Sequence, residues 1–128
     1  MFSVELMGGH FDISKSCRRG DGLVEPGKLA EALQISKSDL AAGAGLSRDD
    51  VCRTSRLASH RTQRRLTEVV AILDKVLPWT GHPRIAYAWY RSQGLPGFGG
   101  LTAEDLVKSG RSEDVEHYLS RISVGGYA

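Results

Sequence analysis

The chain of 128 residues has little cysteine and no long apolar run. Its two cysteines, Cys17 and Cys52, are too few for a disulfide framework and lack the C-x-x-C spacing of a zinc site. No stretch of about 18 apolar residues occurs, so we expect no transmembrane helix. Residues 1–10 lack the basic start and apolar core of a secretory signal peptide. We therefore expect a cytoplasmic protein without a membrane partner.

Motifs of catalytic and metal-binding proteins are also missing. The four histidines lie far apart without a spacing such as H-x-x-x-H, so we expect no metal site. The glycine-rich stretch 94–100 lacks the Lys-Ser/Thr of a phosphate-binding loop, and no Gly-x-Ser-x-Gly elbow is present. Tyr87 and Trp89 are more simply core or interface aromatics than parts of a cofactor site. We expect neither a catalytic site nor a cofactor.

No segment alternates with a period of two for long enough to predict a strand, whereas helical spacing is frequent. A long amphipathic helix is predicted up to Pro78, with apolar residues recurring every three or four positions. These residues are Leu66, Val69, Val70, Ile72, Leu73, Val76 and Leu77. The stripe is wide enough to pack on two sides, so we expect a homodimer that forms through this helix and its neighbours. The predicted fold class is all-α.

Three parts are expected along the chain. Residues 1–21 have no sustained period and form either a mobile arm or a short accessory element. Residues 22–65 are expected to form a helix-turn-helix domain, and residues 66–128 a small helical domain with a C-terminal tail. The long helix joins these two domains.

The helix-turn-helix prediction comes from residues 40–51. A small residue, Ala41, allows two helices to approach closely, and Gly45 permits a left-handed turn. Leu46 and Val51 are expected to fill the wedge between the helices. The same pattern also occurs in helical bundles that bind no DNA, so the prediction of DNA binding depends on the charged residues next to it.

Those neighbours are strongly basic. Residues 46–66 contain six arginines and no lysine against two aspartates, a net charge of +4. Guanidinium groups suit phosphates and base edges, although the charge alone also fits a solvated helix face. We expect a capping box of Ser47 and Asp50 to start a recognition helix that continues to about residue 60. The predicted DNA-binding residues are Ser47, Arg48, Arg53, Arg56 and Arg61. Arg64 and Arg65 either contact the DNA backbone or form a solvated flank of the long helix.

The second half contains four pieces in a characteristic order. Ala86–Ser92 holds a helix with Trp89, Pro96–Gly100 forms a proline-to-double-glycine turn, and Leu101–Val107 begins a helix capped by Thr102. A last helix, Val115–Ile122, precedes the tail Gly125–Ala128. In order and spacing, the stretch from residue 66 to residue 128 resembles the toxin-binding domain of bacterial antitoxins of the Xre/MbcA/ParS type.

The resemblance implies an antitoxin that pairs with a RES-type toxin, a class that attacks NAD. It further implies that the antitoxin blocks the toxin directly and represses its own operon by binding operator DNA, as a homodimer within a hetero-oligomeric complex. The implied toxin-binding residues are Trp89, Arg121, Gly125, Gly126, Tyr127 and Ala128. The tail either threads the toxin's pocket, with Tyr127 stacking and the carboxylate meeting a basic group, or is a frayed terminus. The alternative function is a stand-alone helix-turn-helix regulator with a C-terminal dimerisation domain.

Overall fold

The computed structural model describes residues 12–124, which are mainly helical. Its helices are α2 (Ile13–Cys17), α3 (Pro26–Leu33), α4 (Lys37–Ala44), α5 (Arg48–Cys52), α6 (Thr54–Leu57), α7 (His60–Thr80), α8 (Pro83–Ser92), α9 (Ala103–Lys108) and α10 (Ser112–Val124). The extended pairing in this range is limited to two isolated bridges, Arg18 with Val24 and Gly94 with Thr102. The predicted all-α class is confirmed for this part of the chain.

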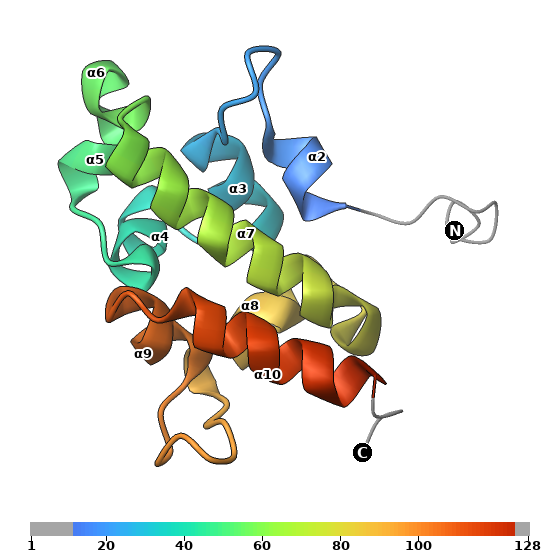
Figure 1. Ribbon diagram of the computed structural model, residues 1–128. Coiled ribbons are helices and arrows are strands. Elements are labelled where there is room, and N and C mark those ends of the chain that lie inside the picture. Colours follow the sequence, from blue (N-terminus) through green and yellow to red (C-terminus); the bar gives the residue numbers. More distant parts are fainter. Residues whose placement is uncertain (1–11, 125–128) are drawn as a thin grey trace, which may run out of the picture.

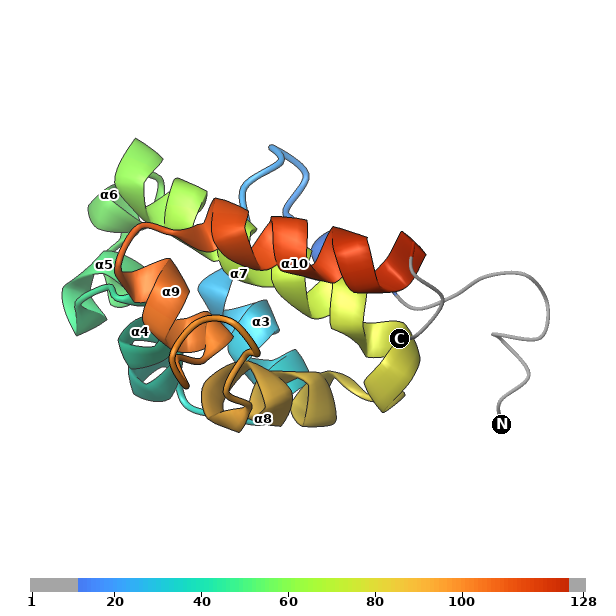
Figure 2. The same ribbon diagram turned by 60° about the horizontal axis from the view of Figure 1, so that its bottom comes forward.

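The long helix α7 lies at the centre of the fold. It packs against α2, α8 and α10, and α10 runs alongside it in Figures 1 and 2. All seven residues of its predicted apolar stripe are buried in the core that α7 shares with these neighbours. The chain's own helices therefore cover this stripe, and its side chains are not exposed to a second copy. The homodimer itself stays a prediction and would need another surface.

Both ends of α7 differ from the prediction. The helix begins at His60, where the Ser59 hydroxyl accepts a hydrogen bond from the Thr62 backbone N–H at 3.2 Å. Pro78 does not end the helix, which continues to Thr80. The helix ends instead before Gly81, whose φ of 82° is left-handed.

The segment before α3 is anchored on α7. Ile13 and Val24 are fully buried in the core. The Asp74 carboxylate accepts a hydrogen bond from the Ile13 backbone N–H at 2.8 Å, which holds the start of α2. The Gln63 side chain accepts from the Val24 N–H at 2.7 Å and donates to the Val24 carbonyl at 3.0 Å. Of the two alternatives for the N-terminal arm, its described part is thus an accessory element packed on α7.

The loop between α8 and α9 is closed on itself. The Leu95 backbone N–H donates to the Leu101 carbonyl at 2.9 Å, and the Leu95 side chain is buried in the core. A Cβ at Gly94 would lie 3.0 Å from the Gly100 carbonyl oxygen, so the close approach of the two loop ends leaves little room for a side chain at Gly94. The turn expected at Pro96–Gly100 is therefore ordered.

Two tyrosines join α8 to α4. The buried Tyr90 hydroxyl donates to the Gly43 carbonyl at 2.7 Å, and the Tyr87 hydroxyl donates to the Asp39 carbonyl at 3.4 Å. A Cβ at Gly43 would overlap the Tyr87 hydroxyl, so a glycine is needed at this contact. The predicted domain boundary after residue 65 lies inside α7, and core residues lie on both sides of it. The division into two domains stays a prediction.

Candidate functional site

The helix pair α4 and α5 forms the centre of the candidate nucleic-acid interface. Ser36 caps α4 by accepting a hydrogen bond from the Asp39 N–H at 3.0 Å. The chain then turns at Gly45, with a left-handed φ of 70°, and enters α5. Leu46 and Val51 are buried beside this turn. The local geometry of the turn, with its glycine and its apolar wedge, is the one expected from the sequence.

The start of α5 is held by the predicted capping box. The Ser47 hydroxyl accepts from the Asp50 N–H at 3.1 Å, and the Asp50 carboxylate accepts from the Ser47 N–H at 2.9 Å. This backbone N–H is the largest cause that lowers the pKa of Asp50, to about 2, and the Ser47 side chain, Arg61 and Arg56 lower it further. The Asp50 carboxylate is therefore ionised throughout the neutral range.

The predicted recognition helix from Arg48 to about residue 60 is wrong in its length. The chain leaves the helical conformation at Arg53, whose φ and ψ are −86° and 129°, and α6 begins afterwards. Val51 and Leu57 are both buried, yet residues six positions apart lie about 120° apart around an unbroken helix, on different faces. The bend at Arg53 allows both side chains to face the interior.

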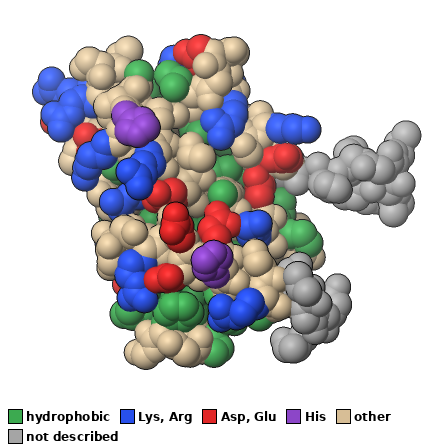
Figure 3. All heavy atoms as spheres, in the orientation of Figure 1, with side chains coloured by type: hydrophobic (Ala, Val, Ile, Leu, Met, Phe, Trp, Pro, Cys, Tyr) green, Lys and Arg blue, Asp and Glu red, His purple; other side chains and the backbone are tan. Residues whose placement is uncertain are grey.

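The predicted DNA-binding residues gather on one corner of the molecule. We call this surface the arginine corner and define it by the exposed side chains Arg48, Arg53, Arg56, Arg61 and Arg64. In Figure 3, blue side chains are concentrated over this region at the upper left. Ser47, also predicted, is exposed at the start of α5. The structure thus brings together every predicted DNA-binding residue.

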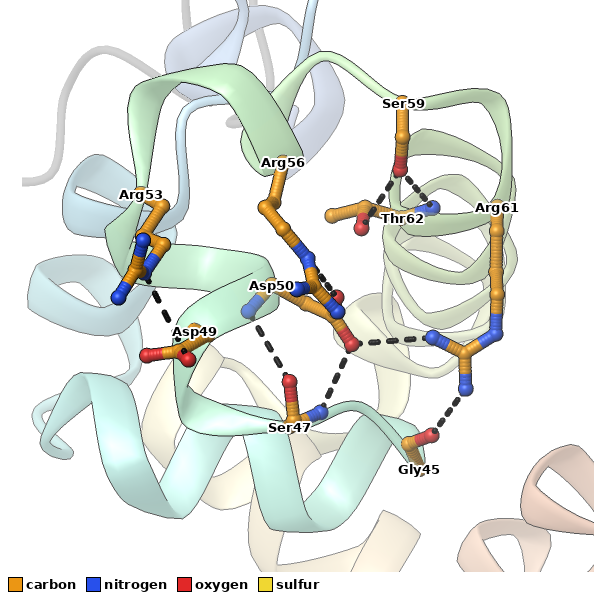
Figure 4. A network of polar contacts seen from close by, with 9 residues as sticks. All are labelled: Gly45, Ser47, Asp49, Asp50, Arg53, Arg56, Ser59, Arg61 and Thr62. Atoms are coloured by element: carbon orange, nitrogen blue, oxygen red, sulfur yellow. Dashed lines mark hydrogen bonds and ion pairs between the residues drawn. The ribbon is translucent and has the colours of Figure 1, made fainter.

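Acidic residues partner several members of the arginine corner (Figure 4). Asp50 lies 3.3 Å from Arg56 Nε and 3.0 Å from Arg61 Nη1. Asp49 lies 3.6 Å from Arg53 Nε. Arg48 has no acidic partner within 4.0 Å in residues 12–124.

Two neighbouring arginines on α7 have different surroundings. Arg64 is 71% exposed and lies 3.5 Å from Glu68, which fits both expectations for it, a contact with the DNA backbone and a solvated flank. Arg65 is 21% exposed, and its Nη1 donates to the carbonyls of Ala44 at 3.2 Å and Val107 at 2.9 Å. Neither expectation for Arg65 holds, because its guanidinium joins the ends of α4 and α9. Its partners lie 21 and 42 positions away, so no local pattern could have predicted this role.

The predicted toxin-binding residues are only partly within the described range. Trp89 is half-buried on α8 and packs against the core, and Arg121 is exposed on α10. No hydrogen bond or ion pair joins these two residues in the described part of the chain. The tail residues Gly125, Gly126, Tyr127 and Ala128 lie outside it.

One side of α8 presents apolar residues to solvent. Ile85 and Ala88 are exposed, whereas Tyr87 and Tyr90 point into the core. The exposed Trp79, near the end of α7, is six positions before Ile85. This end of the molecule therefore presents large apolar side chains to solvent.

Two general properties of the described residues bear on function. No helix between residues 12 and 124 has the length and apolar character needed to cross a membrane. Within the same residues, no group of three or more His, Cys, Asp or Glu side chains is placed to hold a metal ion.

The chain was compared with protein-family models, with curated proteins and with solved structures, and none of them matches.

Proposed function

We propose that the chain is an antitoxin that binds operator DNA through the arginine corner and neutralises a RES-type toxin through its second half. The DNA-binding part rests on one observation, the clustering of five exposed arginines beside the turn between α4 and α5. The antitoxin part rests on the resemblance of residues 66–128 to the toxin-binding domain of Xre/MbcA/ParS-type antitoxins.

The geometry of the arginine corner suits a DNA backbone. Arg48 and Arg53 flank α5 and are exposed, so they can reach base edges or phosphates. Arg56 and Arg61, on α6 and α7, are better suited to contacts with backbone phosphates. Because α5 has only five residues, direct base contacts are restricted to its first turn and to Arg53.

Toxin binding is assigned to the opposite part of the chain. Trp89 on α8 offers a half-buried aromatic surface, and Arg121 on α10 offers an exposed charge near the start of the tail. In this proposal, the tail Gly125–Ala128 reaches the toxin's NAD site and occupies it directly. The helices then supply affinity while the tail supplies inhibition.

The DNA-binding part is tested with a duplex from the region upstream of the protein's own gene. We expect binding that weakens as salt rises, because arginine contacts release counterions from DNA. Arg48→Ala and Arg53→Ala should each weaken binding by about 1–3 kcal/mol. A scrambled duplex of the same composition is the control for sequence preference. Absence of binding to either duplex at low salt would exclude this function.

A stand-alone regulator is the second candidate, and the exposed Trp79 and Ile85 favour it. In this function a second copy of the chain covers these two side chains, which are 43% and 42% exposed. Co-expression with a neighbouring RES-like reading frame separates the two functions. Co-purification of that protein supports the antitoxin, whereas a dimer that binds DNA and ignores the RES-like protein supports the regulator.

A further inference from the structure

The buried carboxylate of Asp50 lies directly behind two members of the arginine corner. Asp50 is 4% exposed, whereas the side chains of Arg56 and Arg61 are 53% and 62% exposed. Figure 4 shows both guanidinium groups converging on the Asp50 side chain from α6 and α7. The two arginines are thus held from behind while much of each side chain remains in contact with solvent.

We propose that Asp50 is a positioning residue that orients Arg56 and Arg61 for binding DNA phosphates. This inference rests on the proposed DNA-binding function and adds a role for a residue that does not touch the DNA. Asp50 acts only through the two arginines.

The hydrogen bonds of the two arginines leave donors available. Arg56 uses only Nε toward Asp50, so its two terminal nitrogens make no other hydrogen bond within the described residues. Arg61 donates from Nη1 to Asp50 and from Nη2 to the Gly45 carbonyl at 3.4 Å, which leaves its Nε uncommitted. A phosphate can therefore be bound while Asp50 keeps both side chains in place.

The bend of the chain at Arg53 makes the contact from Arg56 possible. Residues 50 and 56 would lie about 120° apart around an unbroken helix, on different faces. Because α5 ends and α6 starts in a new direction, Arg56 reaches the carboxylate on the preceding helix. The short recognition helix and the arginine pair are therefore parts of one local arrangement.

Orientation before binding favours affinity for a physical reason. A free arginine side chain loses rotamer freedom when it binds a phosphate, and a side chain that is already held loses less. Asp50 supplies this hold at a position where its own charge is covered by the two guanidinium groups. A carboxylate this close to DNA would otherwise repel phosphate.

The neighbouring residue Asp49 is a natural control. It carries the same charge, but its side chain is 58% exposed and its ion-pair contact is with Arg53 at 3.6 Å. Asp49→Asn and Asp50→Asn change the net charge equally. Electrostatics alone predicts tighter DNA binding for both variants, whereas positioning predicts weaker binding for Asp50→Asn only.

The test measures affinity for the upstream duplex in the full chain and in Asp49→Asn, Asp50→Asn, Arg56→Ala and the double variant Asp50→Asn/Arg56→Ala. We expect unchanged or tighter binding for Asp49→Asn and a loss of about fivefold to a hundredfold for Asp50→Asn. Arg56→Ala should lose much less affinity in the Asp50→Asn background than in the wild type. A role of Asp50 in folding alone would not produce this coupling.

Thermal unfolding of each variant establishes that it is folded at the assay temperature. If Asp50→Asn is unfolded, Arg56→Lys decides, because lysine keeps the charge but lacks the planar guanidinium fork. Its affinity should fall about as far as that of Arg56→Ala, and wild-type affinity would overturn the proposal. Asp50→Asn binding as tightly as Asp49→Asn, with wild-type DNA binding intact, would overturn the positioning role alone. A wild-type chain that binds no duplex would overturn the proposed function and this inference together.

Discussion

Helices α4 and α5 are neighbours in the chain but are held in different ways. The carbonyls of α4 accept hydrogen bonds from Tyr90 on α8 and from Arg65 on α7. Helix α5 is held at its start by its own capping box and by Asp50 ion pairs to partly exposed arginines. The supporting helix is therefore built into the core of the whole chain, whereas the proposed reading helix lies at its edge.

This difference changes how the two proposed activities should separate by mutation. Substitutions on the exposed face of α5 are expected to affect DNA binding alone. Substitutions that loosen α8 reach α4 directly through the tyrosine contacts, so they should weaken DNA binding together with toxin binding. We therefore expect only substitutions of surface residues to affect DNA binding and toxin binding separately.

The largest expected effect distinguishes two adjacent aromatics on α8. Tyr90→Ala removes a fully buried ring and the hydrogen bond to Gly43, so the free energy of unfolding should fall by about 3–5 kcal/mol. Trp89→Ala is the matched control, and its half-buried ring should contribute less to stability while contributing to toxin affinity. Chemical denaturation and toxin pull-down measure the two effects. Equal destabilisation by both variants would contradict the difference between the two faces of α8.

A smaller effect is expected for the adjacent arginines on α7. Arg65→Ala leaves the Ala44 carbonyl without this donor and separates the ends of α4 and α9, which should reduce the free energy of unfolding by about 1–3 kcal/mol. Arg64→Ala removes the same charge from an exposed position and should change the free energy of unfolding by less than about 0.5 kcal/mol. Denaturant titration of both variants checks the difference, and similar losses would show that charge rather than the bridging contact matters.

These two pairs of residues also show what the sequence could predict. The cap at Ser47 and the left-handed turn at Gly45 depend on residues three or four positions apart, so the pattern contained them. The contacts of Arg65 and Tyr90 join residues 21 to 47 positions apart and exist only after the helices have packed.

The candidate site divides in the same way. Clustering of the arginines followed from their local density in the sequence. The bend at Arg53 did not, because it depends on burying Leu57 and Val51 together. The ion pair of Asp50 with Arg61 was also missed, since eleven positions separate them. Sequence reasoning therefore located the surface but not its internal order.

A pH-dependent effect on stability is expected from Asp50. Its pKa is lowered from 3.8 to about 2 in the folded chain, so the carboxylate stabilises the fold above pH 3.8. This stabilisation is lost as the pH falls from about 4 to about 2, because the unfolded chain takes up the proton first. As the pH falls through this range, the melting temperature should decline less steeply for Asp50→Asn than for Asp49→Asn. Parallel declines in the two variants would mean that other carboxylates dominate acid unfolding.

The smallest effect on stability, with a large effect on function, is expected for deletion of Gly125–Ala128. Among the described residues, the last ones that contribute to the core are Leu119 and the half-buried Ile122, and both precede the tail. The deletion should therefore change the free energy of unfolding by well under about 1 kcal/mol. Inhibition of the RES-type toxin should nevertheless be abolished or sharply weakened, because Tyr127 is a residue type enriched among binding hot spots.

If the tail occupies the NAD site, it competes with substrate, so raising the NAD concentration should weaken inhibition by the full chain. NAD consumption by purified toxin, measured with the full and the shortened chain over a range of NAD concentrations, tests both statements. Equal inhibition by the shortened chain, independent of NAD, would assign inhibition to the helical surface around Trp89 instead.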